Sequence, residues 1–159
     1  YKKIQLFILY MPTIFFGSDH AGFLMKKEII ERLNREDINF EIKDLGCYSV
    51  ESCDYPEFAF RVGRNVRIEE GSFGVLLCGT GIGMSIAANK IKGIRCALCN
   101  NYTTVNMARK HNNANIVALG ARNTSADMII PLITAFINTE FDGGRHEKRV
   151  NMIDSTGYL

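Results

Sequence analysis

The sequence predicts an α/β fold of three layers, a doubly wound Rossmann-like arrangement in which helices cover both faces of a five-stranded parallel sheet. Two observations lead to this prediction. Five short apolar runs alternate along the chain with stretches in which apolar residues recur at helical spacing. The segments between successive runs are long enough to form helical crossovers, and crossovers of that kind join parallel strands.

The first half of the chain shows this alternation clearly. Residues 13–17 are apolar and β-rich, and an apolar stripe at helical spacing predicts a helix over 24–33. Residues 38–45 alternate apolar and polar side chains, as a strand with one exposed face does. After a loop, Pro56 suits the first turn of a helix that reaches about residue 70.

The second half continues in the same way. Residues 73–77 form an apolar run that is too short for a helix and suits a buried strand, and a glycine loop and a helix follow it. The remaining elements are expected strands at 94–99 and 115–119, helices at 102–111 and from Thr124 or Ser125 to about 138, and a short terminal helix after Gly143-Gly144.

Composition limits the classes of protein to consider. With 159 residues the chain is long enough for one core, so we expect a single domain over 11–159. Residues 1–10 are interpreted as an upstream extension or a cloning remnant, and their apolar part is far too short to span a membrane. A net charge of +2, spread along the chain, gives no reason to expect a nucleic-acid partner. Five cysteines without even pairing indicate a reducing cytoplasm.

The glycine loop after residues 73–77 is the first candidate for chemistry. Gly79, Gly81 and Gly83 follow Cys78 with the spacing G-x-G-x-G, which is neither the dinucleotide fingerprint nor a Walker loop. Loop amides at a helix start would face an anion, and a thiol beside them would have its thiolate favoured. Two plainer interpretations stay open at this point: a simple strand-to-helix turn, and a cysteine that is a small buried residue.

Other polar residues follow the expected strands or lie near the chain end. Asp19 and His20 follow the first strand, where an open α/β sheet binds its ligands, although Asp19 could be a helix cap and His20 a solvated loop residue. Arg145 and Arg149 are four residues apart, so a helix would present both guanidiniums on one face, either to a phosphate or to solvent. Cys96-x-x-Cys99 lies inside an expected strand and is interpreted as core.

Six segments in order closely resemble the ribose/galactose isomerase family, which includes ribose-5-phosphate isomerase type B, over about residues 13–150. They are Ser-Asp-His-Ala-Gly (18–22), Asp-Tyr-Pro (54–56), Leu-Cys-Gly-Thr-Gly-Ile-Gly-Met-Ser-Ile-Ala-Ala-Asn-Lys (77–90), Gly-Ile-Arg (93–95), Ala-Arg-Lys-His-Asn (108–112) and Gly-Gly-Arg-His-Glu-Lys-Arg-Val (143–150). The resemblance implies interconversion of ribose 5-phosphate and ribulose 5-phosphate, in the non-oxidative pentose phosphate pathway, without metal or organic cofactor.

The resemblance also implies roles for individual residues. Cys78 corresponds to the base, Thr80 to a hydroxyl that assists near C1, and His111 to the histidine that opens the sugar ring. The implied substrate contacts are Asp19, His20, Tyr55, the loop residues Gly79, Gly81, Ile82 and Gly83, then Asn112, Arg145 and Arg149. Of these, His20 and the two arginines correspond to phosphate ligands. A branch of the family uses a glutamate base, but the corresponding position here is Met84, so the cysteine branch is indicated.

The family resemblance further implies a homodimer or tetramer with active sites at the subunit interface, and we expect the terminal helix to pack on a partner subunit. Three alternatives remain at this stage. The substrate could be a six-carbon sugar phosphate, such as allose or galactose 6-phosphate. The chain could be a sugar-phosphate sensor without turnover. A cysteine redox or hydrolytic enzyme is the third, although the sequence places no resolving cysteine or histidine beside Cys78.

Overall fold

A computed structural model describes residues 11–36, 38–122 and 124–156, so the predicted extension at 1–10 lies outside the described residues. Five strands form one sheet, in the order β2-β1-β3-β5-β4, and every neighbouring pair is parallel. The strands are β1 (Thr13–Ser18), β2 (Glu41–Asp44), β3 (Phe73–Cys78), β4 (Cys96–Leu98) and β5 (Ile116–Gly120). The predicted five-stranded parallel sheet is confirmed.

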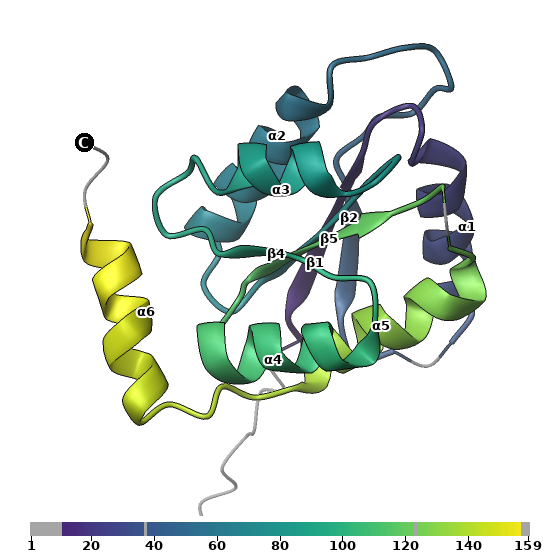
Figure 1. Cartoon of the computed structure of the whole chain (residues 1–159). Helices are drawn as coiled ribbons and strands as arrows, with labels where there is room; N and C mark the ends of the chain where they lie inside the picture. The colour runs from purple at the N-terminus through teal and green to yellow at the C-terminus, as the bar shows by residue number, and fades with distance from the viewer. Residues whose placement is uncertain (1–10, 37, 123, 157–159) are drawn as a thin grey trace, which may run out of the picture.

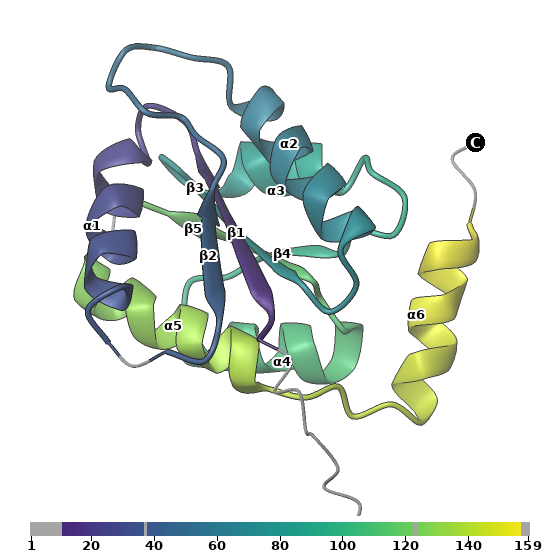
Figure 2. The ribbon, with the colours of Figure 1, turned by 180° about the vertical axis from the view of Figure 1, so that it is seen from behind.

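Helices cover both faces of this sheet, as Figures 1 and 2 show from opposite sides. The helices are α1 (Phe23–Leu33), α2 (Tyr55–Ile68), α3 (Ile82–Ala88), α4 (Tyr102–Asn112), α5 (Ala126–Asn138) and α6 (Arg145–Ser155). α2 and α3 pack on one face, and α1, α4 and α5 pack on the other. The three-layer arrangement is therefore as predicted. None of the helices in the described ranges is both long and apolar enough to cross a membrane.

The two faces of the sheet bury two separate apolar clusters, and β1 shows how the sequence divides them. All six residues of β1 are buried, because a central parallel strand is covered on both sides. Ile14 and Phe16 enter the cluster beneath α1, α4 and α5, whereas Phe15 enters the cluster beneath α2 and α3. Successive side chains of a strand point to opposite faces, so one apolar run supplies both clusters.

The outer strands are shorter than the sequence predicts. The pattern over 38–45 yields β2 only at Glu41–Asp44, and the pattern over 94–99 yields β4 only at Cys96–Leu98. Both are edge strands with one neighbour, so fewer of their backbone groups join the ladder. Cys96 and Cys99 are buried, which confirms their interpretation as core, and burial raises the pKa of both thiols.

The terminal helix α6 stands beside α4 at the side of the molecule, away from the layers that cover the sheet (Figure 1). Only His146 and Val150 of α6 are buried, whereas Met152 and Ile153 are 60% and 55% exposed. A helix with so small an apolar stripe gains little from burial in one chain. This agrees with the prediction of a terminal helix that has little core of its own.

Candidate active site

Asp19 and Cys78 meet at the carboxyl edge of the sheet because β1 and β3 are parallel neighbours, with Ser18 paired to Leu77. The amide of Asp19 donates to the carbonyl of Leu77 over 3.2 Å. The Asp19 side chain is buried, and its Oδ1 accepts a 2.9 Å hydrogen bond from the amide of Gly22. Asp19 therefore ties down the turn between β1 and α1 at the position where ligands bind in such sheets.

Cys78 ends β3 and is followed by the glycine loop that leads into α3. Its Sγ accepts a hydrogen bond of 3.0 Å from the amide of Gly81, so a backbone donor already points at the sulfur. Gly81 has a φ of +81° and closely approaches Leu119 on β5, two conditions that glycine meets best. Thr80 Oγ1 accepts from the amide of Ile82 over 3.3 Å. The loop is thus held tight around the cysteine, as the sequence predicts.

Tyr55 joins this edge from the start of α2. Its ring lies so close to Gly83 that a Cβ on that glycine would stand 2.7 Å from Tyr55 Cζ. The absence of a side chain at position 83 therefore makes room for the ring over the first turn of α3. Tyr55 remains 40% exposed, which leaves part of it free to contact a bound molecule.

His20 lies in the turn after β1 and faces the loop between β2 and α2. Its Nδ1 accepts a 3.3 Å hydrogen bond from the amide of Cys53. An imidazole that accepts at Nδ1 carries its proton at Nε2, so His20 offers one N–H donor to a ligand. Such a donor suits a phosphate oxygen, which is the role that the family resemblance implies.

The loop that orients His20 is anchored by a buried lysine. The side chain of Lys26 on α1 is fully buried, pairs with Asp44, and donates to the carbonyl of Cys47 over 2.8 Å. Burial lowers the pKa of Lys26, and the contact with Asp44 opposes that effect. Because a buried charge must keep its partners, this network holds the start of the loop in one place.

A cavity of about 560 Å³ opens beside the glycine loop. Gly79, Thr80 and Ile82 of the glycine loop line it, together with Asn100, Asn101 and Met128 from outside the loop. This volume is within the usual range for small-molecule sites. The loop predicted to bind an anion therefore borders a space that can hold one.

Arg122 is a polar residue at this edge to which the sequence analysis assigns no role. It follows β5, whose Gly120 is paired with Cys78, and its guanidinium Cζ would be 2.9 Å from a Cβ at Gly79. The sequence does indicate that Arg122 lies at the carboxyl edge of the sheet, because it is two residues after the end of a strand. What the sequence did not supply was the strand order, which makes β5 the neighbour of β3.

His111, Asn112, Arg145 and Arg149 form a second group, on α4 and α6. The ring of His111 stacks on that of His146, with centroids 4.1 Å apart and planes 5° from parallel. Arg145 Nε donates to His146 Nε2 over 3.5 Å, and both arginines are exposed. The group is cationic and accessible, as a binding site for a phosphate needs to be.

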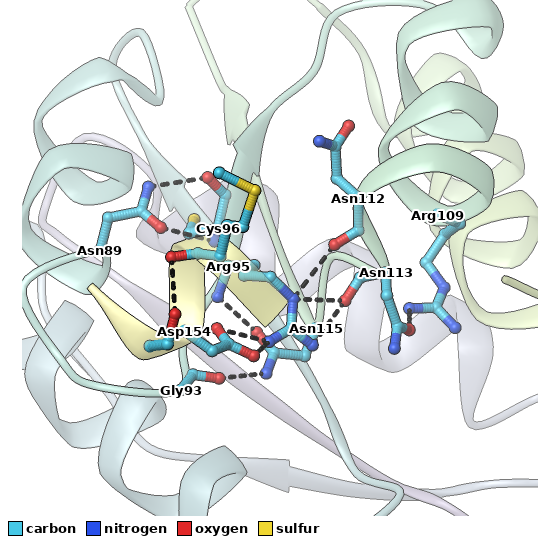
Figure 3. A network of polar contacts seen from close by, with 11 residues as sticks. Asn89, Gly93, Arg95, Cys96, Arg109, Asn112, Asn113, Asn115 and Asp154 are labelled. Atoms are coloured by element: carbon cyan, nitrogen blue, oxygen red, sulfur yellow. Dashed lines mark hydrogen bonds and ion pairs between the residues drawn. The ribbon is translucent and has the colours of Figure 1, made fainter. Parts of the chain in front are cut away.

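Arg95 ties the two helices of this second group together, as Figure 3 shows. Its guanidinium binds both carboxylate oxygens of Asp154 on α6, over 2.8 and 3.1 Å. The same guanidinium donates to the carbonyls of Asn112 and Asn113 at the end of α4, each over 3.1 Å. The mostly buried side chain of Arg95 thus fixes the last turn of α6 relative to the last residues of α4.

The two groups lie at opposite ends of the strands, the first at the carboxyl ends and the second at the amino ends. We call Asp19, His20, Tyr55 and residues 78–83 the cysteine half-site, and His111, Asn112, Arg145 and Arg149 the histidine half-site. α4 runs antiparallel to the strands, so Asn112 precedes the start of β5 at Ile116, whereas Cys78 is level with the end of β5 at Gly120. Four residue steps at roughly 3.3 Å each separate the edges by about 13 Å along the strand. Within one chain the half-sites do not meet.

The pKa of His146 is lowered by burial and by the nearby His111, Arg145 and Arg149, whereas Asp142 opposes this effect. Folding therefore favours the neutral imidazole. The contribution of His146 to the free energy of unfolding is therefore fully present above the pKa of the unfolded state, about 6.5. It is lost as the pH falls towards the lower pKa of the folded state. Urea unfolding measured at about pH 7.5 and about pH 5.5 gives the free energy of unfolding at each pH. Its decrease from the higher to the lower pH should be smaller for His146→Phe than for the parent chain. An equal loss in both proteins would mean that other groups account for the pH dependence.

Within the described residues, no three His, Cys, Asp or Glu side chains gather as metal ligands would. The geometry instead places a cysteine with amide donors at one end of the strands, and stacked histidines with arginines at the other. This set can exchange protons with a small molecule and hold an anionic group of it.

Comparison with known proteins identifies the family. Residues 14–153 match the profile of the ribose/galactose isomerase family. The chain is 39% identical to ribose-5-phosphate isomerase B of Escherichia coli over 143 residues, covering 90% of this chain and 95% of that protein. A ribose 5-phosphate isomerase structure from Thermotoga maritima matches with a TM-score of 0.87 and 44% identity, covering 92% of this chain and 100% of that one. The type B ribose 5-phosphate isomerase of Trypanosoma brucei matches with a TM-score of 0.86 and 41% identity, covering 92% and 99%. The chain belongs to the ribose/galactose isomerase family.

Proposed function

We propose that this protein is an aldose–ketose isomerase that interconverts D-ribose 5-phosphate and D-ribulose 5-phosphate. The observation that carries the proposal is Cys78, which lies at the carboxyl edge of the sheet with an amide donor on its sulfur, beside a cavity of small-molecule size. Relatives that share about two fifths of the sequence over nearly the whole chain bear this activity in their names.

The chemistry needs a base, donors for a developing oxyanion, and a group that opens the sugar ring. Cys78 takes the proton from C2 of the open-chain aldose, and the electron pair forms the C1–C2 double bond while negative charge develops on O1. Under this proposal the amides of the glycine loop and the Thr80 hydroxyl stabilise that charge. Return of the proton to C1, with transfer of the O2 proton to O1, gives the ketose. No electron acceptor is required.

A complete site under this proposal needs two copies of the chain. The histidine half-site of one copy would complete the cysteine half-site of the other, since about 13 Å of strand separates them within one chain. Exposed apolar side chains that line the cavity, Ile82, Leu98 and Met128, offer a surface that a second copy can cover. The proposal therefore includes a homodimer, or a tetramer of two dimers, with α6 packed on the partner.

The proposal also places the enzyme in the cytoplasm. All five cysteines are free thiols, three of the four outside the glycine loop are buried, and a reducing compartment keeps such thiols unpaired.

Arg149→Ala should raise KM about tenfold or more and leave kcat within about threefold, because a phosphate is bound equally in the ground state and the transition state. Steady-state kinetics with ribose 5-phosphate measures both constants. Arg64→Ala, which removes an exposed arginine from the middle of α2, is the matched control and should leave both unchanged. An unchanged KM in Arg149→Ala would remove that residue from the phosphate site.

A coupled assay of the pure chain tests the function itself. Ribose 5-phosphate and allose 6-phosphate are offered separately, each with and without EDTA. Rapid turnover of ribose 5-phosphate that EDTA does not affect is the expected result. Preference for the six-carbon substrate would move the chain to the other activity of its family, and binding of both esters without turnover would make it a sensor.

A further inference from the structure

His146 is buried against the one residue of the histidine half-site that the proposed mechanism uses for proton transfer. Its exposed fraction is 9%, and its ring covers one face of the His111 imidazole at 4.1 Å, nearly parallel. The two rings come from different helices, α4 and α6, so the stack exists only when α6 is docked. None of the roles proposed above uses His146.

The polar contacts of His146 keep its ring neutral. Within the described residues the imidazole ring has one hydrogen bond, the 3.5 Å contact in which Arg145 Nε donates to Nε2, so the ring proton belongs on Nδ1. The titratable and charged groups around it are His111 on α4, Arg145 and Arg149 on α6, and Asp142 before α6. Burial lowers the pKa of His146, the three basic groups lower it further, and Asp142 alone raises it.

We propose that His146 is a positioning residue for His111, which it holds flat in the orientation required to open the furanose ring. This inference rests on the proposed function. A stacked ring restricts rotation of the His111 imidazole and covers its face, whereas the two nitrogen atoms lie on the ring's edge. When His111 takes up a proton, a neutral aromatic face stabilises the imidazolium, whereas a second imidazolium would repel it.

Ring opening, the step in which His111 acts, is needed for ribose 5-phosphate and not for ribulose 5-phosphate. In ring opening the C1–O4 bond of ribose 5-phosphate breaks, O4 gains a proton, and O1 loses its proton as the C1 carbonyl forms. Ribulose 5-phosphate cannot close a five-membered ring, because its C5 hydroxyl carries the phosphate. A residue that acts through ring opening therefore affects turnover of ribose 5-phosphate far more than turnover of ribulose 5-phosphate.

The alternative role for His146 is simply to dock α6. Two other contacts already serve that purpose, because Val150 is buried and Asp154 pairs with Arg95 at the other end of the helix. Asp154→Asn removes the ion pair at the far end of α6, while the buried Val150 still holds the end of the helix that carries His146, so both imidazole rings stay in place. It is therefore the matched control for a purely structural effect.

The test compares His146→Ala, His146→Phe and Asp154→Asn with the parent protein on both substrates. In His146→Ala, kcat from ribose 5-phosphate should fall about tenfold, a part of what general acid–base catalysis contributes, while kcat from ribulose 5-phosphate changes less than about twofold. His146→Phe retains a flat ring and should recover most of that loss. Asp154→Asn should raise KM for both substrates without this asymmetry.

A second readout does not depend on turnover. The ring protons of His111 should shift in the NMR spectrum of His146→Ala, because a stacked ring no longer shields them, and should stay in place in Asp154→Asn. Equal loss of kcat with both substrates, or parent-like kinetics in His146→Ala, would overturn the inference while the proposed function stands. A parent protein that isomerises neither substrate would overturn the proposed function and this inference with it.

Discussion

Cys78→Ala should lower kcat by roughly two to four orders of magnitude, the contribution that a general base makes to proton transfer. Alanine removes the sulfur that accepts the Gly81 amide and leaves the rest of the loop intact. Substrate should still bind, because the proposed phosphate contacts come from His20 and the α6 arginines. Steady-state kinetics gives kcat, and isothermal titration with ribose 5-phosphate gives the dissociation constant.

A second cysteine provides the control for this experiment. Cys96 is buried in β4, and burial raises the pKa of its thiol, so the thiol stays protonated and cannot accept a proton from a substrate. Cys96→Ala should retain the kcat of the parent even if it unfolds at a lower urea concentration. Full activity in Cys78→Ala would show that another group removes the C2 proton.

Mixing two inactive variants should restore activity if each site is built from two chains. Cys78→Ala and His111→Ala each impair a different half-site. In a mixed dimer, one site carries both substitutions and the other carries none. Random assembly makes half of the dimers mixed, so an equimolar refolded mixture should recover about one quarter of the parent activity.

The control mixture combines Cys78→Ala with Thr80→Ala. Both residues belong to the cysteine half-site, so every site in a mixed dimer carries one substitution and no activity should return. Recovery in both mixtures would point to an artefact of refolding. If the first mixture recovers no activity although both variants fold and assemble, each site lies within one chain.

The fold and the cysteine half-site could be predicted from the sequence because their signals are local. A buried run such as 73–77, a glycine loop and a helical stripe each depend on the conformational preferences of a few consecutive residues. The parallel sheet then follows from crossover length, and the carboxyl ends of β1 and β3 bring Asp19 and Cys78 together. The edge strands were overestimated, because pairing on one side only supports fewer residues than the apolar pattern covers.

The tertiary structure alone decided which side chains are neighbours across long separations. The strand order β2-β1-β3-β5-β4 places Arg122 beside Gly79, and the direction of α4 carries His111 to the edge opposite Cys78. The docking of α6 stacks His146 on a histidine that is 35 residues earlier in the chain. Such contacts depend on how whole elements pack, and no periodicity within an element encodes its neighbours. The sequence by itself therefore determined the fold and the candidate chemistry, and packing decided that the candidate residues form two separate half-sites.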